Sequence, residues 1–286
     1  ILGDVLATAY QQSQLKIGNY IAKSLSVGDL FMAAIVPGLI LVFLYGLYFV
    51  FSLKKEVLTI DENQKHENFF KLISTLIPPF FLIFAVLGSI ITGIASPTEA
   101  AGIGALGAII IALIHKKLNL KILKESTTQS AFISSMVFLI LIGASIFSLV
   151  FRGLGGEELI TEIFNAIPGG LFGSMLLVML LVFVLGFILD FIEITFIVVP
   201  IVGPILMAMG ADPLWLGVML AINLQTSFLT PPFGFALFYL RSVTPETIST
   251  ESMYKGVFPF ILIQILVLCL VAYFPFLATL LPELIF

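Results

Sequence analysis

The sequence predicts an all-α protein that crosses a membrane several times. Of its 286 residues, 60% are hydrophobic and only 10% are charged, against roughly 45–50% and 25% in soluble domains. Five continuous apolar stretches are long enough for membrane helices, and two further apolar stretches are broken near the middle by polar, Pro or Gly residues. The bilayer is therefore expected to be the main solvent of this chain.

Composition also excludes several functions. The net charge of -4 is small and the basic residues lie in short loops, so the sequence indicates no nucleic-acid partner. One cysteine and two histidines allow neither an intramolecular disulfide nor a Cys/His metal cluster. No P-loop motif occurs, and Asp190 has no second membrane-embedded Asp with which to form a protease dyad. We therefore expect neither an ATPase nor an enzyme.

The continuous spans follow in chain order from about 20 apolar residues per crossing. The chain opens with residues 1–29, which are polar and are expected to form a linker on the periplasmic side. Because it begins without an initiator Met, we expect it to be part of something longer. We predict membrane spans at Leu30–Leu53, Leu72–Ile94, Thr98–Ile114, Ala131–Phe151 and Val257–Leu281.

The distribution of Lys and Arg predicts the orientation. Most of the 13 basic residues fall in loops that the spans place on one side, which is then cytoplasmic. Lys16, Lys23 and Arg152 lie on the opposite side, provided that the broken stretch Leu171–Met209 is a re-entrant hairpin. If that stretch instead crossed twice, its midpoint would lie in an aqueous loop, and charge counting alone does not decide between the two.

The first broken stretch, Leu171–Met209, carries acidic and hydroxyl groups at its midpoint, in LDFIEIT. Carboxylates at membrane depth cost at least a few kcal/mol each, so Asp190 and Glu193 are candidate functional residues if they lie at depth. The alternative is that both lie in a water-exposed loop.

The second broken stretch, Leu214–Val243, reads NLQTSFLTPPFGFALFY through its middle. Pro231 and Pro232 remove two backbone donors and disfavour helical geometry just before them, so the helix should unwind there. Unwinding frees carbonyl oxygens of the kind that coordinate Na⁺, and the helix that resumes points its positive end at an anion. The alternative is a proline kink that only adjusts packing. Two interrupted segments at corresponding depth favour a transporter site.

A further motif starts the helix near residue 97. Ser96 fits an N-cap, Pro97 and Thr98 follow it, and Glu99 stands at the third helical position, which together form a capping box. This structural role alone explains the motif, and the alternative is that Glu99 has a further role beside capping.

Three of these stretches resemble the large membrane subunit, of the DctM type, of tripartite ATP-independent periplasmic (TRAP) transporters. They are GIASPTEAAGIGALGA, LGFILDFIEITFIVVPIVGPI and NLQTSFLTPPFGFALFYL. The resemblance runs over essentially the whole chain, which corresponds to the C-terminal two-thirds of such a subunit. On this resemblance, the first repeat's hairpin is expected to lie outside this chain.

The resemblance implies an elevator-type secondary transporter of the bacterial inner membrane that imports a small organic anion, a carboxylate, with Na⁺. Implied partners are a small membrane subunit of the DctQ type, a periplasmic substrate-binding protein and the missing N-terminal part. No cofactor other than the coupling ion is expected. Carried over to this sequence, the substrate and ion contacts are Asp190, Thr195, Asn223, Gln225, Thr226, Thr230, Pro231, Pro232 and Gly234. Na⁺ is assigned to Thr226, Thr230, Gly234 and nearby main-chain carbonyls.

The expected division follows from this assignment. Residues 30–151 form membrane helices of the scaffold and arm, residues 152–256 hold the second repeat's hairpin and broken helix, and residues 257–286 form the last membrane helix. The rival interpretation is a structural or channel-forming subunit without coupled transport.

Overall fold

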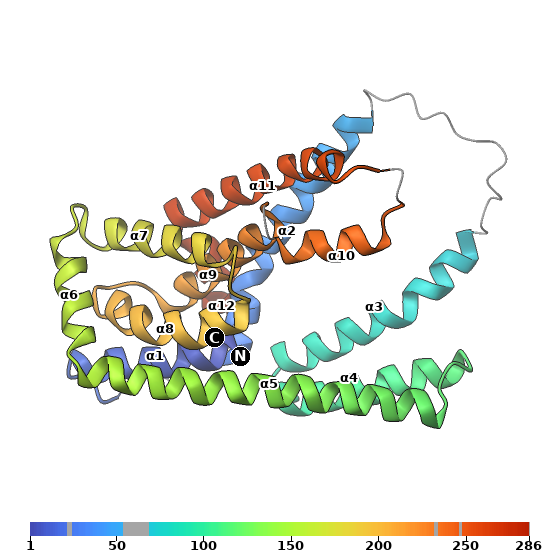
Figure 1. Ribbon diagram of the computed structural model, residues 1–286, viewed down its shortest axis with the longest axis horizontal. Coiled ribbons are helices and arrows are strands. Elements are labelled where there is room, and N and C mark those ends of the chain that lie inside the picture. The colour runs from blue at the N-terminus through green and yellow to red at the C-terminus, as the bar shows by residue number, and fades with distance from the viewer. Residues whose placement is uncertain (22–24, 54–68, 232–233, 246–247, 286) are drawn as a thin grey trace. The chain divides into compact units, whose positions relative to one another are not determined.

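The computed structural model describes residues 1–21, 25–53, 69–231, 234–245 and 248–285. All regular structure in these ranges is α-helical, which confirms the predicted fold class (Figure 1). The helices are α1 (Leu2–Lys16), α2 (Val27–Leu53), α3 (Phe69–Ile91), α4 (Pro97–Ile114), α5 (Leu120–Gly153), α6 (Gly156–Ala166), α7 (Gly170–Leu185), α8 (Phe191–Ala208), α9 (Pro213–Leu229), α10 (Phe235–Val243), α11 (Thr250–Tyr273) and α12 (Phe276–Ile285).

Five helices in the described ranges are long and apolar enough to cross a bilayer, namely α2, α4, α5, α8 and α11. The pair α6 and α7 adds a sixth candidate, bent by 118° at its break, and Figure 1 shows this sharp turn. The first four predicted continuous spans are covered almost entirely by α2, α3, α4 and α5. Both broken stretches are interrupted where the sequence predicted, at 186–190 and at 230–234.

The predicted continuous span Val257–Leu281 is wrong. Helix α11 ends at Tyr273 and α12 begins at Phe276. Pro275 lies between them, lacks a backbone N–H, and disfavours helical geometry at the residue before it. Phe274 accordingly has φ −122° and ψ 76°. The residues on both sides of this break are apolar, so a count of apolar residues alone predicts one continuous helix.

The polar opening of the chain, expected as a linker, contains α1. Its buried residues are Gly3, Leu6, Ala9 and Ser13, which recur at helical spacing along one face. This face packs on α8, where a Cβ added to Gly203 would lie 3.3 Å from the Ala9 side chain. Helix α1 is therefore part of the packed core, although most of its exposed residues are polar.

The chain divides into two compact units, residues 1–48 with 137–286, and residues 49–136. The core of the larger unit is built on α8 and α9. Of the most apolar window of α8, 61% is buried within the chain, against 11% for α5. Protein therefore encloses α8, whereas most of α5 is left to lipid or to other protein.

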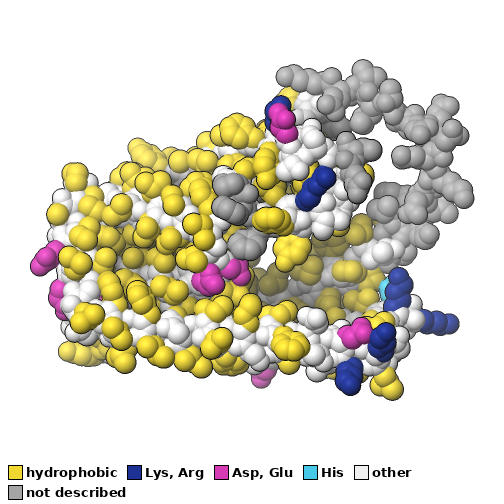
Figure 2. Space-filling view, viewed as in Figure 1, with side chains coloured by type: hydrophobic (Ala, Val, Ile, Leu, Met, Phe, Trp, Pro, Cys, Tyr) yellow, Lys and Arg dark blue, Asp and Glu magenta, His cyan; other side chains and the backbone are white. Residues whose placement is uncertain are grey.

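In the smaller unit α3 packs against α4. A Cβ added to Gly104 would lie 3.3 Å from Val86, so glycine allows the two helices to approach closely. Figure 2 shows apolar side chains spread over much of the displayed face, as expected for a protein solvated by lipid.

Candidate functional site

The turn between α7 and α8 packs against the end of α9. Gly186, at the C-terminus of α7, lies so close to Ser227 that an added Cβ would come within 2.7 Å of the serine Cβ. The ring of Phe191, at the start of α8, meets the ring of Phe228 edge-on with centroids 6.4 Å apart. The two interruptions are thus brought together although they are distant in sequence.

Asp190 is the N-cap of α8. Its Oδ1 accepts a hydrogen bond from the backbone N–H of Phe191 at 2.7 Å, and Glu193 Oε2 accepts one from the N–H of Asp190 at 3.3 Å. The two residues form a capping box, and both are half-buried. The structure therefore explains these carboxylates by helix capping.

Thr195 lies one turn further into α8 and is completely buried. Its hydroxyl oxygen has no hydrogen-bond partner among the described residues. Most buried hydroxyl groups in proteins are hydrogen-bonded, because leaving one unpaired costs about 1–3 kcal/mol. The Thr195 hydroxyl is therefore available to form a hydrogen bond close to the start of α8.

Asn223 connects α9 to α7. It is 1% exposed, and its Nδ2 donates to the backbone carbonyl of Met179 at 2.7 Å. That carbonyl belongs to the helix that leads into the turn at Gly186. Asn223 thus positions one interrupted segment on the other through a buried hydrogen bond.

The hydroxyl groups of Thr226 and Thr230 follow one another along the last turn of α9. Thr226 Oγ1 donates to Ile222 O and Thr230 Oγ1 donates to Thr226 O, each at 2.7 Å. Thr226 is fully buried and Thr230 half-buried. Each hydroxyl donates its proton to a carbonyl oxygen. The lone pairs of the hydroxyl oxygen therefore remain available to accept a hydrogen bond or to coordinate a cation.

The helix unwinds at Thr230, which is extended with φ −91° and ψ 128°. The chain turns back so that the N–H of buried Gly234 donates to Thr230 O at 3.2 Å. A Cβ at Gly234 would lie 2.6 Å from Phe228 O and 3.1 Å from Thr230 O. Two main-chain carbonyls therefore converge on this glycine, as the predicted unwinding requires. Pro231 is half-buried, and the predicted site residue Pro232 lies outside the described residues.

Gln225 differs from these residues in its exposure to solvent or lipid. It is exposed, and it lines a cavity of about 500 Å³ between α2, α9, α10 and α11. Among the predicted site residues, the structure thus places Thr226, Thr230 and Gly234 at the break, Asn223 one helical turn before Thr226, and Asp190 and Thr195 at the start of α8. The described residues hold no group of three or more His, Cys, Asp or Glu that could bind a metal ion.

The capping box at residues 96–99 lies in the smaller unit. Glu99 Oε2 accepts from Ser96 N–H at 2.8 Å, and Ser96 Oγ accepts from Glu99 N–H at 3.4 Å. Pro97 and Thr98 occupy the first two helical positions of α4. These residues therefore start a helix.

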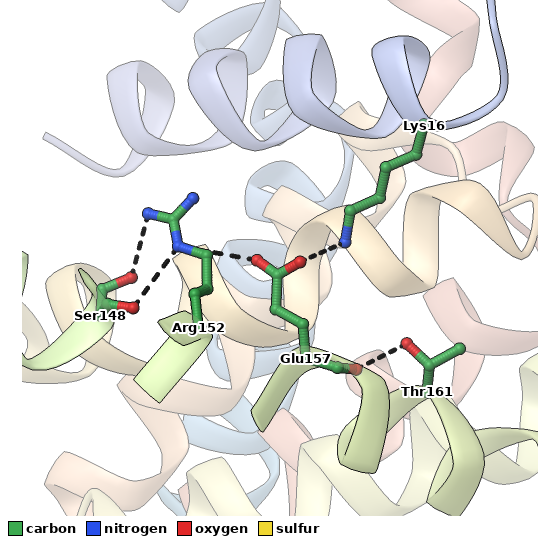
Figure 3. A network of polar contacts seen from close by, with 5 residues as sticks. All are labelled: Lys16, Ser148, Arg152, Glu157 and Thr161. Carbon is green, nitrogen blue, oxygen red and sulfur yellow. Dashed lines mark hydrogen bonds and ion pairs between the residues drawn. The ribbon is translucent and has the colours of Figure 1, made fainter. Parts of the chain in front are cut away.

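A polar network joins α1, α5 and α6 (Figure 3). Lys16 Nζ lies 2.7 Å from Glu157 Oε2, and Arg152 Nε lies 3.7 Å from Glu157 Oε1. Charge counting predicted Lys16 and Arg152 on the same side of the membrane, and here one carboxylate bridges them. Sequence reasoning missed Glu157, because its partner Lys16 lies 141 residues away in the sequence.

Gly186 and Met179 were also missed, since their roles are contacts across the fold. The capping role of Asp190 did leave a signal, because Asp-x-x-Glu before an apolar run is a capping pattern.

Comparison with known proteins finds similar sequences over about nine-tenths of the chain. The model of the family described as "Tripartite ATP-independent periplasmic transporter, DctM component" matches residues 16–277. The sialic acid TRAP transporter large permease protein SiaM of Vibrio cholerae is 29% identical over 92% of this chain and 62% of its own length. The C4-dicarboxylate TRAP transporter large permease protein DctM of Rhodobacter capsulatus is 29% identical over 92% of this chain and 59% of its own.

The sialic acid TRAP transporter permease protein SiaT of Haemophilus influenzae is also 29% identical, over 91% of this chain and 42% of its own length. The chain therefore spans less than two-thirds of the curated relatives that it matches.

Proposed function

The chain belongs to the DctM family of tripartite ATP-independent periplasmic transporters, and we propose that it supplies an ion-coupling half of such a transporter's large permease. The family consists of transport permeases, so this chain is not an enzyme. It is a multi-pass protein of the bacterial inner membrane. We propose Na⁺ as the coupling ion and a small organic anion, a carboxylate, as the solute.

The observation that carries the proposal is the packing of the α7–α8 turn on the unwound end of α9. At the break the carbonyls of Phe228 and Thr230 converge on Gly234. The hydroxyl of Thr230 stands at the end of α9, and that of Thr226 one helical turn before it. Hard cations are bound by such neutral oxygens, and irregular backbone at membrane depth is tolerated where it lines a cavity or a site. These groups support Na⁺ binding at residues 226–234.

The anion is supported by the two helices that start at this place. α8 begins at Phe191 and α10 at Phe235, and a helix N-terminus carries a partial positive charge of roughly half a unit. Two such ends beside bound Na⁺ favour a carboxylate. The Asp190 carboxylate caps the first of them, which leaves α10 as the better-placed end for a solute.

The partners follow from the family and not from the residues of this chain. We propose that the complete permease works with a small membrane subunit of the DctQ type and with a periplasmic substrate-binding protein, and that the elevator motion carries α7–α10 as one body. Because the chain spans about 60% of its full-length relatives, a complete site is proposed only for the complete subunit.

The rival is a channel or structural subunit in which the breaks are kinks. Liposomes containing the complete large subunit and its small subunit discriminate between the two. The proposal predicts accumulation of solute against its gradient only when an inward Na⁺ gradient and the binding protein are both supplied. Downhill flux that ignores Na⁺ and the binding protein would identify a channel.

A further inference from the structure

The cavity of about 500 Å³ described above touches both arms of the broken helix. Phe228 and Leu229 line it from α9, before the break, and Ala236 lines it from α10, after the break. Tyr45 of α2 and Phe260 of α11 form the opposite wall, with their rings in edge-on contact and centroids 5.2 Å apart. None of the described residues that line this cavity is charged.

Gln264 of α11 also lines the cavity and is only 2% exposed. Its Oε1 has no hydrogen-bond partner among the described residues, and Tyr45 lines the same cavity. A buried amide oxygen without a donor is destabilising, so it gains from any donor placed within reach. A terminal amide rotates easily about its last torsion, which lets the oxygen turn toward the cavity.

The depth of Gln264 limits which donor can reach it. Gln264 lies nine residues after Lys255 and nine before Tyr273, so each end of this apolar segment is about 14 Å away along the helix. The hydrocarbon core is about 30 Å thick, so Gln264 lies near its middle. Lipid hydroxyl and amine groups stay at the interface, and acyl chains carry no donors. A solute that crosses beside the broken helix does bring donors to this depth.

From this cavity we infer that Gln264 determines solute specificity by accepting a hydrogen bond from a hydroxyl or N–H group on the uncharged body of the solute. The inference rests on the proposed function. The charged end of the solute then lies at the start of α10, and its body lies between the aromatic wall and the two arms of the break. The solute class is a hydroxylated or N–H-bearing organic anion, preferred over the analogue that lacks the donor.

The test uses the complete large subunit with its small subunit, purified in detergent at high Na⁺. Sodium salts are titrated in matched pairs that differ in hydroxyl groups, namely malate and succinate, isethionate and ethanesulfonate, and gluconate and hexanoate. Thermal stabilisation gives the apparent Kd of each. The variants are Gln264→Met, which keeps the volume and removes the amide, and Tyr45→Phe, which removes only a hydroxyl of the same cavity. Gln129→Leu, on the exposed part of α5, is the control.

We expect the hydroxylated member of at least one pair to bind at least 10-fold more tightly than its partner. Gln264→Met should weaken that member roughly 10- to 100-fold and leave the other unchanged, which abolishes the preference. Tyr45→Phe and Gln129→Leu should keep the preference, since the amide acceptor is intact.

Two results overturn the inference. One is a wild-type protein that prefers the hydroxylated member of no pair, and the other is an equal loss for both members in Gln264→Met. A wild type whose melting temperature and transport ignore Na⁺ contradicts the proposed function instead. A Na⁺ response that survives without any hydroxyl preference contradicts only the role of Gln264.

Discussion

Gly186 of the α7–α8 turn lies directly against Ser227 of α9, with no room for a side chain between them. The contact joins the turn of one interrupted segment to the last helical turn before the other. Because a packed interior has little free space, we expect a change at the unwound end of α9 to displace the turn as well. This contact gives a structural reason why ion binding at one break should affect the other.

Replacing Gly186 by Ala is therefore expected to be destabilising. The new methyl group meets the Ser227 side chain, and overpacking of this kind costs about 1–3 kcal/mol. Thermal unfolding in detergent should show a clear fall in melting temperature, with partial recovery in the double variant Gly186→Ala, Ser227→Gly. Gly46→Ala is the matched control, since a Cβ there meets nothing within 4 Å. A Gly186→Ala protein as stable as the control would contradict the close contact.

Gly234 is expected to tolerate no side chain. A Cβ at this position lies 2.6 Å from the carbonyl oxygen of Phe228, and backbone cannot yield as a flexible side chain does. Gly234→Ala should therefore displace the carbonyls proposed to bind Na⁺ and raise the Na⁺ concentration for half-maximal uptake by about 10-fold or more. Gly256→Ala, in open space on α11, should leave it unchanged. Equal Na⁺ dependence in both variants would place the ion elsewhere.

Asn223 is expected to contribute mainly to the stability of the folded protein. Asn223→Leu removes the buried hydrogen bond to the Met179 carbonyl, at a cost of about 0.5–1.5 kcal/mol. Unfolding of the complete subunit should show this loss, whereas Gln225→Leu, at an exposed neighbouring position, should shift stability by less than about 0.5 kcal/mol. The hydrogen bond is unimportant if the two variants unfold alike.

The orientation can be tested by labelling. In a Cys269→Ser background, single cysteines at positions 16 and 152 should react with a membrane-impermeant maleimide from the periplasmic side. A cysteine at position 121 should react only after the membrane is opened. Lys16 and Arg152 share Glu157 as a partner, so they must label from the same side. Labelling of 16 and 121 from one side would reverse the assignment.

Much of this fold could be predicted from the local chemistry of the sequence. The double proline after Thr230 and the polar midpoint near Asp190 mark breaks that the backbone makes at those positions. Pro275 carried the same signal, yet the surrounding apolar residues concealed it. The burial of α1 could not be predicted from the sequence, because its apolar face is short and its partner, α8, lies almost two hundred residues later.

Only part of the candidate site could be predicted from the sequence. Residue types predicted that Thr226, Thr230 and Gly234 belong to one break, since they are close in sequence. The contacts from Asn223 to Met179 and from Gly186 to Ser227 join segments about forty residues apart and depend on the packing of α7 on α9. Asp190 shows the opposite case, because a carboxylate chosen for its cost in a membrane proves to satisfy the first backbone donors of α8.

The central claim is that the two interrupted segments form the Na⁺ coupling site. The most direct test is solute uptake against Na⁺ concentration in liposomes holding the complete permease and its binding protein, comparing wild type with Thr230→Val, Thr230→Ser and Asp190→Asn. Thr230→Val keeps the shape and loses the oxygen, Thr230→Ser keeps the oxygen, and Asp190→Asn keeps a capping group and loses the charge. We predict that Thr230→Val and Asp190→Asn raise the Na⁺ requirement and Thr230→Ser does not. If all three variants follow the wild-type curve, these residues are structural and the coupling site lies elsewhere.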